Sequence, residues 1–269
     1  MIAVVDYQKG NLKSVERGLV AAGGEALITA DASEIAKADA IVLPGVGAFA
    51  DAAATMCELG QMEIIRERVR AGVPFLGICL GEHLMFEHGV EGAPEGNPAC
   101  GLGLLPGTVV AMPRYDAQGK AFKVPHVGWN TIEIPACGGG AAVPPCGEGG
   151  ENAVLSSGGA GGGAARSSAA KRGLFEHGAF PGSAPQAGSE LAFACPLFDG
   201  IAPGEYFYFT HSYIAPTGSH TIAETTHSVR FTSAVQYGDR AFGVQFHPEK
   251  SSDAGARVLA NFVAIAARG

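Results

Sequence analysis

The sequence predicts an α/β fold with a central, largely parallel β-sheet flanked by helices and a β-rich second half. In the first eighty residues, short apolar runs alternate with helix-length segments, a pattern typical of parallel strands joined by helical crossovers. After about residue 103, strand-like segments dominate. A low-complexity stretch at about residues 136–194 interrupts this half. We therefore expect a single domain over residues 1–269 that carries one insertion.

Four strands are expected in the first half, because each is a short apolar run fit for burial on both faces of a sheet. They cover residues 2–6, 26–29, 38–43 and 73–79. The intervening segments predict helices, the first from Asn11 to Leu19. The next follows Asp31, which has the spacing of a capping box with Glu34, and a helical stretch after residue 47 ends at Arg70.

The second half predicts four longer strands and one closing helix. The strands cover residues 108–112, 123–134, 206–214 and 233–246, the last with a hairpin turn at Gly238 and Asp239. An amphipathic helix is expected over residues 253–267. Between residues 136 and 194, runs of glycine, alanine and serine leave little that could pack. Such a segment cannot offset an ordering entropy of about 1–2 kcal/mol per residue, so we expect a disordered surface insertion.

Composition excludes several classes of function. The formal net charge of −8, without a basic run, argues against a nucleic-acid partner. The start of the chain lacks a signal-peptide pattern, and its apolar runs are too short to span a bilayer. The six cysteines have neither C-x-x-C nor zinc-ligand spacing. We therefore expect a cytoplasmic protein that contacts neither membrane nor nucleic acid and holds no metal.

The strongest chemical signal is the Gly-Ile-Cys-Leu-Gly segment at residues 77–81, directly after an apolar strand. A G-x-C-x-G sequence at a strand-to-helix junction is the cysteine form of the nucleophile elbow. The glycines permit a tight turn, which lifts the Cys79 sulfur clear of the sheet and aims it at the amino terminus of a helix, where a thiolate is favoured. A buried structural cysteine is the alternative, but the flanking glycines favour a nucleophile for an acyl carbon.

A base and its orienting acid are expected near the carboxyl end, at His247 and Glu249. In an extended segment, residues two apart face the same way, and Pro248 stiffens the backbone between them. The carboxylate can then orient the imidazole and stabilise its protonated form. A His-Pro-Glu segment alone is more often a solvated turn, so the pairing with Cys79 carries this interpretation.

Together these motifs resemble the class I, triad-type glutamine amidotransferases, whose fold is flavodoxin-like. Pro-Gly-Val-Gly at residues 44–47 adds to the resemblance. Three further segments, at residues 6–12, 125–130 and 207–213, together with His-Pro-Glu-Lys-Ser at 247–251, are similar to the glutaminase-subunit family of imidazole glycerol phosphate synthase, of histidine biosynthesis. The resemblance covers the chain except for residues 136–194.

The resemblance implies that Cys79 attacks the carboxamide of L-glutamine, with His247 as base and Glu249 as its orienter. The ammonia would pass to a (β/α)8-barrel cyclase subunit in a heterodimer, which makes imidazole glycerol phosphate and an aminoimidazole carboxamide ribonucleotide, and no cofactor is implied. Residues implied to bind glutamine or hold its oxyanion are Gly45, Val46, Gly47, Leu80, His83, His211, Ser212 and Tyr213. Residues implied to lie near the partner are Asn11, Trp129, Tyr208 and Lys250.

One departure from the family pattern bears on the site. Glu82 and His83 stand where the family usually has Met-Gln. His83 puts substrate affinity in question, although an imidazole can also donate and accept hydrogen bonds. Glu82 would oppose a thiolate unless it faces solvent. A glutaminase of another synthase, a catalytically silent scaffold subunit and a hydrolase of free γ-glutamyl compounds remain alternatives.

Overall fold

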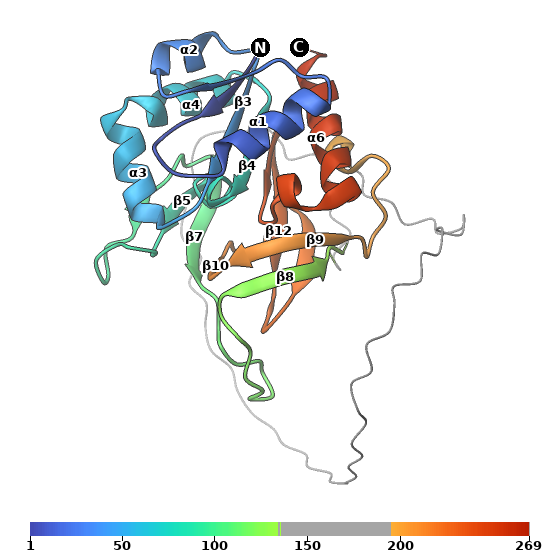
Figure 1. The fold of residues 1–269 in the computed structure, drawn as a ribbon. Helices are drawn as coiled ribbons and strands as arrows, with labels where there is room; N and C mark the ends of the chain where they lie inside the picture. The colour runs from blue at the N-terminus through green and yellow to red at the C-terminus, as the bar shows by residue number, and fades with distance from the viewer. Residues whose placement is uncertain (134, 136–194, 269) are drawn as a thin grey trace, which may run out of the picture. The chain divides into compact units, whose positions relative to one another are not determined.

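The structure is a computed structural model that describes residues 1–133, 135 and 195–268. The expected insertion at 136–194 lies outside the described residues. Two layers of helices enclose the main sheet, and two smaller sheets lie beside it (Figure 1). Among the described residues, no helix has the length and apolar content needed to cross a bilayer.

A seven-stranded sheet forms the centre of the fold, in the order β11-β12-β13-β4-β3-β1-β2. Its parallel strands are β1 (Ile2–Val5), β2 (Ala26–Thr29), β3 (Ala40–Gly45), β4 (Phe75–Cys79) and β13 (Ala241–Val244). The antiparallel strands at one edge are β12 (Arg230–Tyr237) and β11 (Thr221–Thr226). The prediction of a central, largely parallel sheet is confirmed.

Helices cover both faces of this sheet. The helices on one face are α1 (Leu12–Ala21) and α6 (Ser252–Ala266), and those on the other are α2 (Ala32–Lys37), α3 (Phe49–Glu58) and α4 (Gln61–Arg70). Successive residues of β1 point to opposite faces: Ile2 and Val4 join the core under α1 and α6, whereas Ala3 and Val5 join the other core. Burial on both faces explains why these strands read as continuous apolar runs.

Two smaller sheets lie beside the central one. The first has the order β10-β7-β5-β6, and the second pairs β8 with β9. The bounds are β5 (Phe86–Gly89), β6 (Ala99–Cys100), β7 (Leu105–Ala111), β8 (His126–Thr131), β9 (Tyr206–His211) and β10 (Tyr213–Ile214). The short 3-10 helices are η1 (Pro196–Phe198) and η2 (Pro248–Lys250).

Several expected elements are shorter or divided in the structure. The helical stretch that was expected to end at Arg70 consists of α3 and α4, because Gly60 between them adopts a left-handed conformation with φ 68°. The strand expected at 206–214 divides into β9 and β10, which pair with different partners. The helix that follows Cys79 is a single turn, α5 (Leu80–His83).

Candidate active site

Cys79 lies at the carboxyl end of β4 in a strained conformation. Its φ of 55° and ψ of −105° are uncommon for a residue with a side chain. Close packing imposes this turn: a Cβ at Gly77 would lie 2.5 Å from the carbonyl oxygen of Gly81, and a Cβ at Gly81 would collide with that of Leu43. The lack of a side chain at Gly77 and Gly81 therefore allows the tight turn expected of a nucleophile elbow. Because α5 has only one turn, the helix dipole at the sulfur is weaker than a long helix would supply.

His247 and Glu249 form a buried pair near Cys79. The Nδ1 atom of His247 lies 3.0 Å from Oε1 of Glu249, and both side chains are almost fully buried. Because a carboxylate only accepts, His247 donates from Nδ1. Among the described residues, the buried Nε2 atom has no hydrogen-bond partner, and Cys79 is close enough to raise the pKa of His247. This leaves one ring nitrogen free for the sulfur, as a nucleophile–base arrangement requires.

The local backbone around this pair differs from the sequence expectation. His247 is extended, with φ −101° and ψ 96°, but η2 then turns the chain from Pro248 to Lys250. The main-chain N–H of His247 bonds to the Tyr208 carbonyl oxygen at 2.9 Å, and Ser251 Oγ donates to the His247 carbonyl oxygen at 2.6 Å. The prediction of one extended segment through Glu249 is therefore wrong, because the proline opens a 3-10 turn. The two side chains nevertheless meet.

The charge state of His247 depends on its two neighbours. Burial by itself would lower its pKa, but the hydrogen bonds and negative charges of Cys79 and Glu249 raise the pKa of His247 to about 9. At neutral pH the site therefore favours an imidazolium beside the sulfur. Such a pair supplies both a nucleophile and a proton for a leaving group.

A cavity of about 330 Å³ opens at Cys79, which suits a small ligand. The register of β3 against β4 pairs Gly45 with Cys79, so the loop after Gly45 lies beside the sulfur. The residues that line the cavity are Val46, Gly47, Cys79, Leu80, His83, Glu91, Pro125, Thr210, His211, Ser212 and Tyr213. All the residues implied to contact glutamine or its oxyanion line this cavity except Gly45, which packs against the buried Tyr7 hydroxyl.

His211 is held in place by a buried network. Its Nδ1 bonds to the carbonyl oxygen of Tyr213 at 2.8 Å, and its Nε2 lies 3.0 Å from Nδ1 of His126. Burial lowers the pKa of His211 well below its ordinary value, so the ring is neutral at pH 7. Because Tyr213 offers a carbonyl oxygen, His211 donates from Nδ1. His126 was not among the residues expected at the site.

His83 lines the cavity at Cys79, whereas its neighbour Glu82 lies inside the core. Glu82 is fully buried, and within the described part of the chain neither carboxylate oxygen has a hydrogen-bond partner; Oε2 lies 3.9 Å from Nε2 of His83. Burial raises the pKa of Glu82 well above its ordinary value, which favours a neutral acid. Glu82 therefore avoids opposing a thiolate by holding its proton, not by facing solvent. His83 lines the cavity and also bonds through Nε2 to Oε1 of Gln245 at 2.7 Å.

Three of the four residues expected at a partner surface lie together on the β8–β9 ribbon and the turn next to it. Trp129 and Tyr208 are paired across the strands, with ring centroids 6.1 Å apart. Lys250 places its Nζ 5.9 Å from the Tyr208 ring centroid. Among the described residues, no hydrogen bond or ring contact joins Asn11 to these three. Figure 1 shows this ribbon extending away from the helices α2 and α3.

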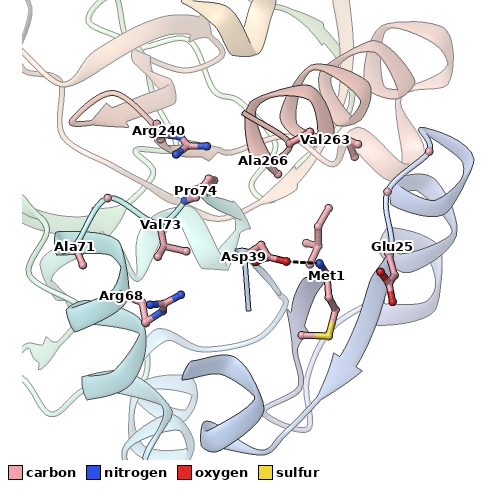
Figure 2. Close-up of a pocket in the computed structure, with 15 residues that line it drawn as sticks. Met1, Glu25, Asp39, Arg68, Ala71, Val73, Pro74, Arg240, Val263 and Ala266 are labelled. Atoms are coloured by element: carbon pink, nitrogen blue, oxygen red, sulfur yellow. Dashed lines mark hydrogen bonds and ion pairs between the residues drawn. The ribbon is translucent and has the colours of Figure 1, made fainter. Parts of the chain in front are cut away.

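A second cavity, of about 530 Å³, lies at the opposite end of the parallel strands (Figure 2). Four of its charged groups already bond to the protein. The Met1 ammonium pairs with Asp39 at 2.5 Å, and Arg68 and Arg240 each donate to a main-chain carbonyl oxygen. In open α/β sheets, ligands bind at the carboxyl ends of the strands. The cavity at Cys79 is at that end and is the candidate active site.

Comparison with known proteins gives matches over most of the chain. A family model described as glutamine amidotransferase class-I matches residues 3–134 and 168–266. The chain is 36% identical over 263 residues to the imidazole glycerol phosphate synthase subunit HisH of Moorella thermoacetica, covering 97% of this chain and 93% of that one. It is 33% identical over 264 residues to the protein of the same name from Syntrophotalea carbinolica, covering 97% and 98%.

Solved structures with low sequence identity share the fold. A glutamine amidotransferase aligns with a TM-score of 0.58 at 16% identity, over 99% of this chain and 98% of that one. PurLQS from Thermotoga maritima aligns with a TM-score of 0.56 at 14% identity, over 98% and 97%. At these identities the likeness concerns the arrangement of helices and strands alone.

Proposed function

Because the chain belongs to the glutamine amidotransferase class-I family, we propose that it is the glutaminase subunit of imidazole glycerol phosphate synthase. It hydrolyses L-glutamine to glutamate and ammonia for histidine biosynthesis. The observation that carries this proposal is the strained Cys79 at the mouth of a small cavity, beside the buried pair of His247 and Glu249.

The chemistry follows from the positions of these three residues. The Cys79 sulfur attacks the side-chain carboxamide carbon of glutamine, which forms a tetrahedral intermediate. His247 gives its proton to the departing ammonia, and the intermediate collapses to a thioester. Water, activated by His247, then cleaves the thioester and releases glutamate. Glu249 keeps the imidazole in the tautomer that both steps need.

The oxyanion of the intermediate needs donors next to the sulfur. The main-chain N–H of Leu80 lies in the first turn after Cys79, and the residues Val46 and Gly47 line the same cavity. We assign the oxyanion to these backbone groups. His211, Ser212 and Tyr213 line the cavity as well, and we assign to them the main-chain atoms of the bound glutamine.

The partner is a cyclase subunit with a (β/α)8 barrel, bound as a heterodimer. The exposed Trp129, the Tyr208 ring beside it and the Lys250 ammonium form one aromatic and cationic surface on the β8–β9 ribbon and the adjoining turn. Trp and Tyr side chains are common anchors of protein interfaces. Asn11, at the start of α1, completes the proposed contact set. Because Cys79 must stay reduced, the reaction belongs in the cytoplasm.

The test is glutamate release from glutamine by the purified chain, alone and with a cyclase subunit plus its nucleotide substrate. Wild type should be strongly stimulated by the partner, and Cys79→Ala should abolish release. Cys57→Ala is the matched control, because Cys57 is exposed and lies on α3. Release without a partner would favour a free hydrolase, and no release under any condition would favour a silent scaffold.

A further inference from the structure

Gln245 approaches the nucleophile from within the core. The side chain is fully buried, and its Nε2 lies 3.7 Å from the Cys79 sulfur. Its main-chain N–H bonds to the Ser233 carbonyl oxygen at 3.0 Å, which fixes the residue at the end of β13. Gln245 does not line the cavity. It therefore contacts the sulfur without being placed to contact the substrate.

His83 determines which end of the Gln245 amide faces the sulfur. The amide oxygen lies 2.7 Å from Nε2 of His83. Because an oxygen can only accept, His83 must donate from Nε2. Burial lowers the pKa of His83 to about 4, although the bond to Gln245 raises it, so the ring carries one proton at neutral pH. With that proton on Nε2, the amide N–H groups are directed toward Cys79.

The opposite amide orientation would oppose the chemistry. It would place the amide oxygen, a hydrogen-bond acceptor, against the negative charge of a thiolate, and the two would repel each other. It would also require His83 to present a lone pair at Nε2. Only one combination satisfies all three groups: His83 carries its proton on Nε2, the Gln245 oxygen faces His83, and the Gln245 N–H groups face the Cys79 thiolate.

We propose that Gln245 is a positioning residue that donates a hydrogen bond to the Cys79 sulfur, and that His83 fixes the amide orientation for this task. The inference rests on the proposed function, in which Cys79 is the nucleophile. A hydrogen bond to the thiolate raises the thiolate fraction before attack. It also stabilises the same sulfur when it leaves the thioester. His83 thus has two roles: it lines the cavity, and it orients the Gln245 amide that contacts the sulfur.

This arrangement predicts how substitutions at position 83 should behave. A glutamine at 83 can also donate an N–H to the Gln245 oxygen, whereas leucine cannot. His83→Gln should therefore preserve the network, and it should lower the glutamine KM or leave it unchanged. His83→Leu should lose the donor and replace the imidazole with an apolar side chain of similar bulk. The two variants separate hydrogen bonding from space filling.

The experiment measures the pH profile of Cys79 alkylation by iodoacetamide in the full chain, resolved by peptide mass spectrometry. Cys57, which is exposed, serves as the reference thiol in the same sample. Gln245→Leu and His83→Leu should move the half-reaction pH of Cys79 upward by about one unit, whereas His83→Gln should match wild type. With the cyclase present, Gln245→Leu should lower kcat about tenfold and change KM less than twofold.

An unchanged alkylation profile in Gln245→Leu would overturn the proposal. If that variant does not fold, as judged by circular dichroism, the His83→Leu and His83→Gln pair decides. Equal profiles for these two would overturn the role of His83. Glutamate release by wild type with unchanged profiles in every variant would refute this inference and leave the proposed function standing. Shifted profiles without glutamate release would support the hydrogen bond and refute the function.

Discussion

Gly81 packs against the carbonyl oxygen of Leu43, so closely that a Cβ at residue 81 would collide with it. This contact joins the first turn after the nucleophile to the neighbouring strand β3. The same strand leads into the loop that contains Val46 and Gly47. The position of Cys79 relative to the proposed oxyanion donors therefore depends on one glycine.

Gly81→Ala should destabilise the protein by about 3 kcal/mol or more, because backbone must move to accept the methyl group. The free energy of unfolding from urea titration measures this effect. Gly96→Ala is the control for backbone strain without collision: unlike Gly81, Gly96 has positive φ, at 75°, and a Cβ there meets no atom within 4 Å. Its cost should be about 1–2 kcal/mol, from left-handed backbone alone. Equal losses in both variants would mean that the contact with Leu43 relaxes easily.

Glu82 should make stability depend on pH. Burial raises its pKa in the folded protein above the ordinary value of 4.5. The folded state therefore binds the proton more tightly than the unfolded chain does. The stabilisation of the folded state that comes from this tighter proton binding is full below about pH 4.5. It is lost as pH rises toward the folded-state pKa, by up to about 1.4 kcal/mol per pH unit.

Glu82→Gln removes this titration, so the stability difference between the variant and wild type should grow in favour of the variant from pH 5 to pH 8. Thermal unfolding at several pH values measures it. Glu67→Gln, at an exposed position on α4, should follow the wild-type curve. Parallel curves for Glu82→Gln and wild type would show that Glu82 loses its proton in the folded state as easily as in the unfolded one.

Glu249→Gln should lower kcat about a hundredfold or more, because an amide can donate to His247 Nδ1 and so favour the wrong tautomer. Loss of the carboxylate also lowers the pKa of His247 from about 9. Glutamate release with the cyclase present measures kcat, and Glu58→Gln, exposed at the end of α3, is the control. Activity within threefold of wild type would remove Glu249 from the proposed mechanism.

The parallel half of the fold could be predicted because its strands are buried on both faces and read as apolar runs. Strand β11 was not predicted. Its buried positions are Thr221, Ala223 and Thr225, whose small or polar side chains give little hydrophobic alternation. Strand β5 was also missed, because Glu87 and His88 in its centre are polar. In both cases pairing with neighbouring strands decides the structure.

Part of the site could likewise be predicted from local sequence. Cys79 was singled out by its flanking glycines and His247 with Glu249 by their spacing, and the structure brings these three residues together. The bond between His83 and Gln245 joins residues 162 positions apart, so no local pattern indicates it. One signal was available: Gln245 precedes His247 by two residues, and alternation along an extended segment would place both side chains toward Cys79.

Trp129→Ala should weaken binding of the cyclase subunit by about 2 kcal/mol, or roughly 30-fold in Kd. The Trp129 side chain is 51% exposed, and its ring meets Tyr208 edge-on, so a partner could bury a large apolar area there. Isothermal titration calorimetry measures the Kd. Leu27→Ala is the matched control, since Leu27 is 41% exposed on β2, at the far edge of the central sheet. An equal loss of affinity in both variants, or none in Trp129→Ala, would move the interface away from the β8–β9 ribbon.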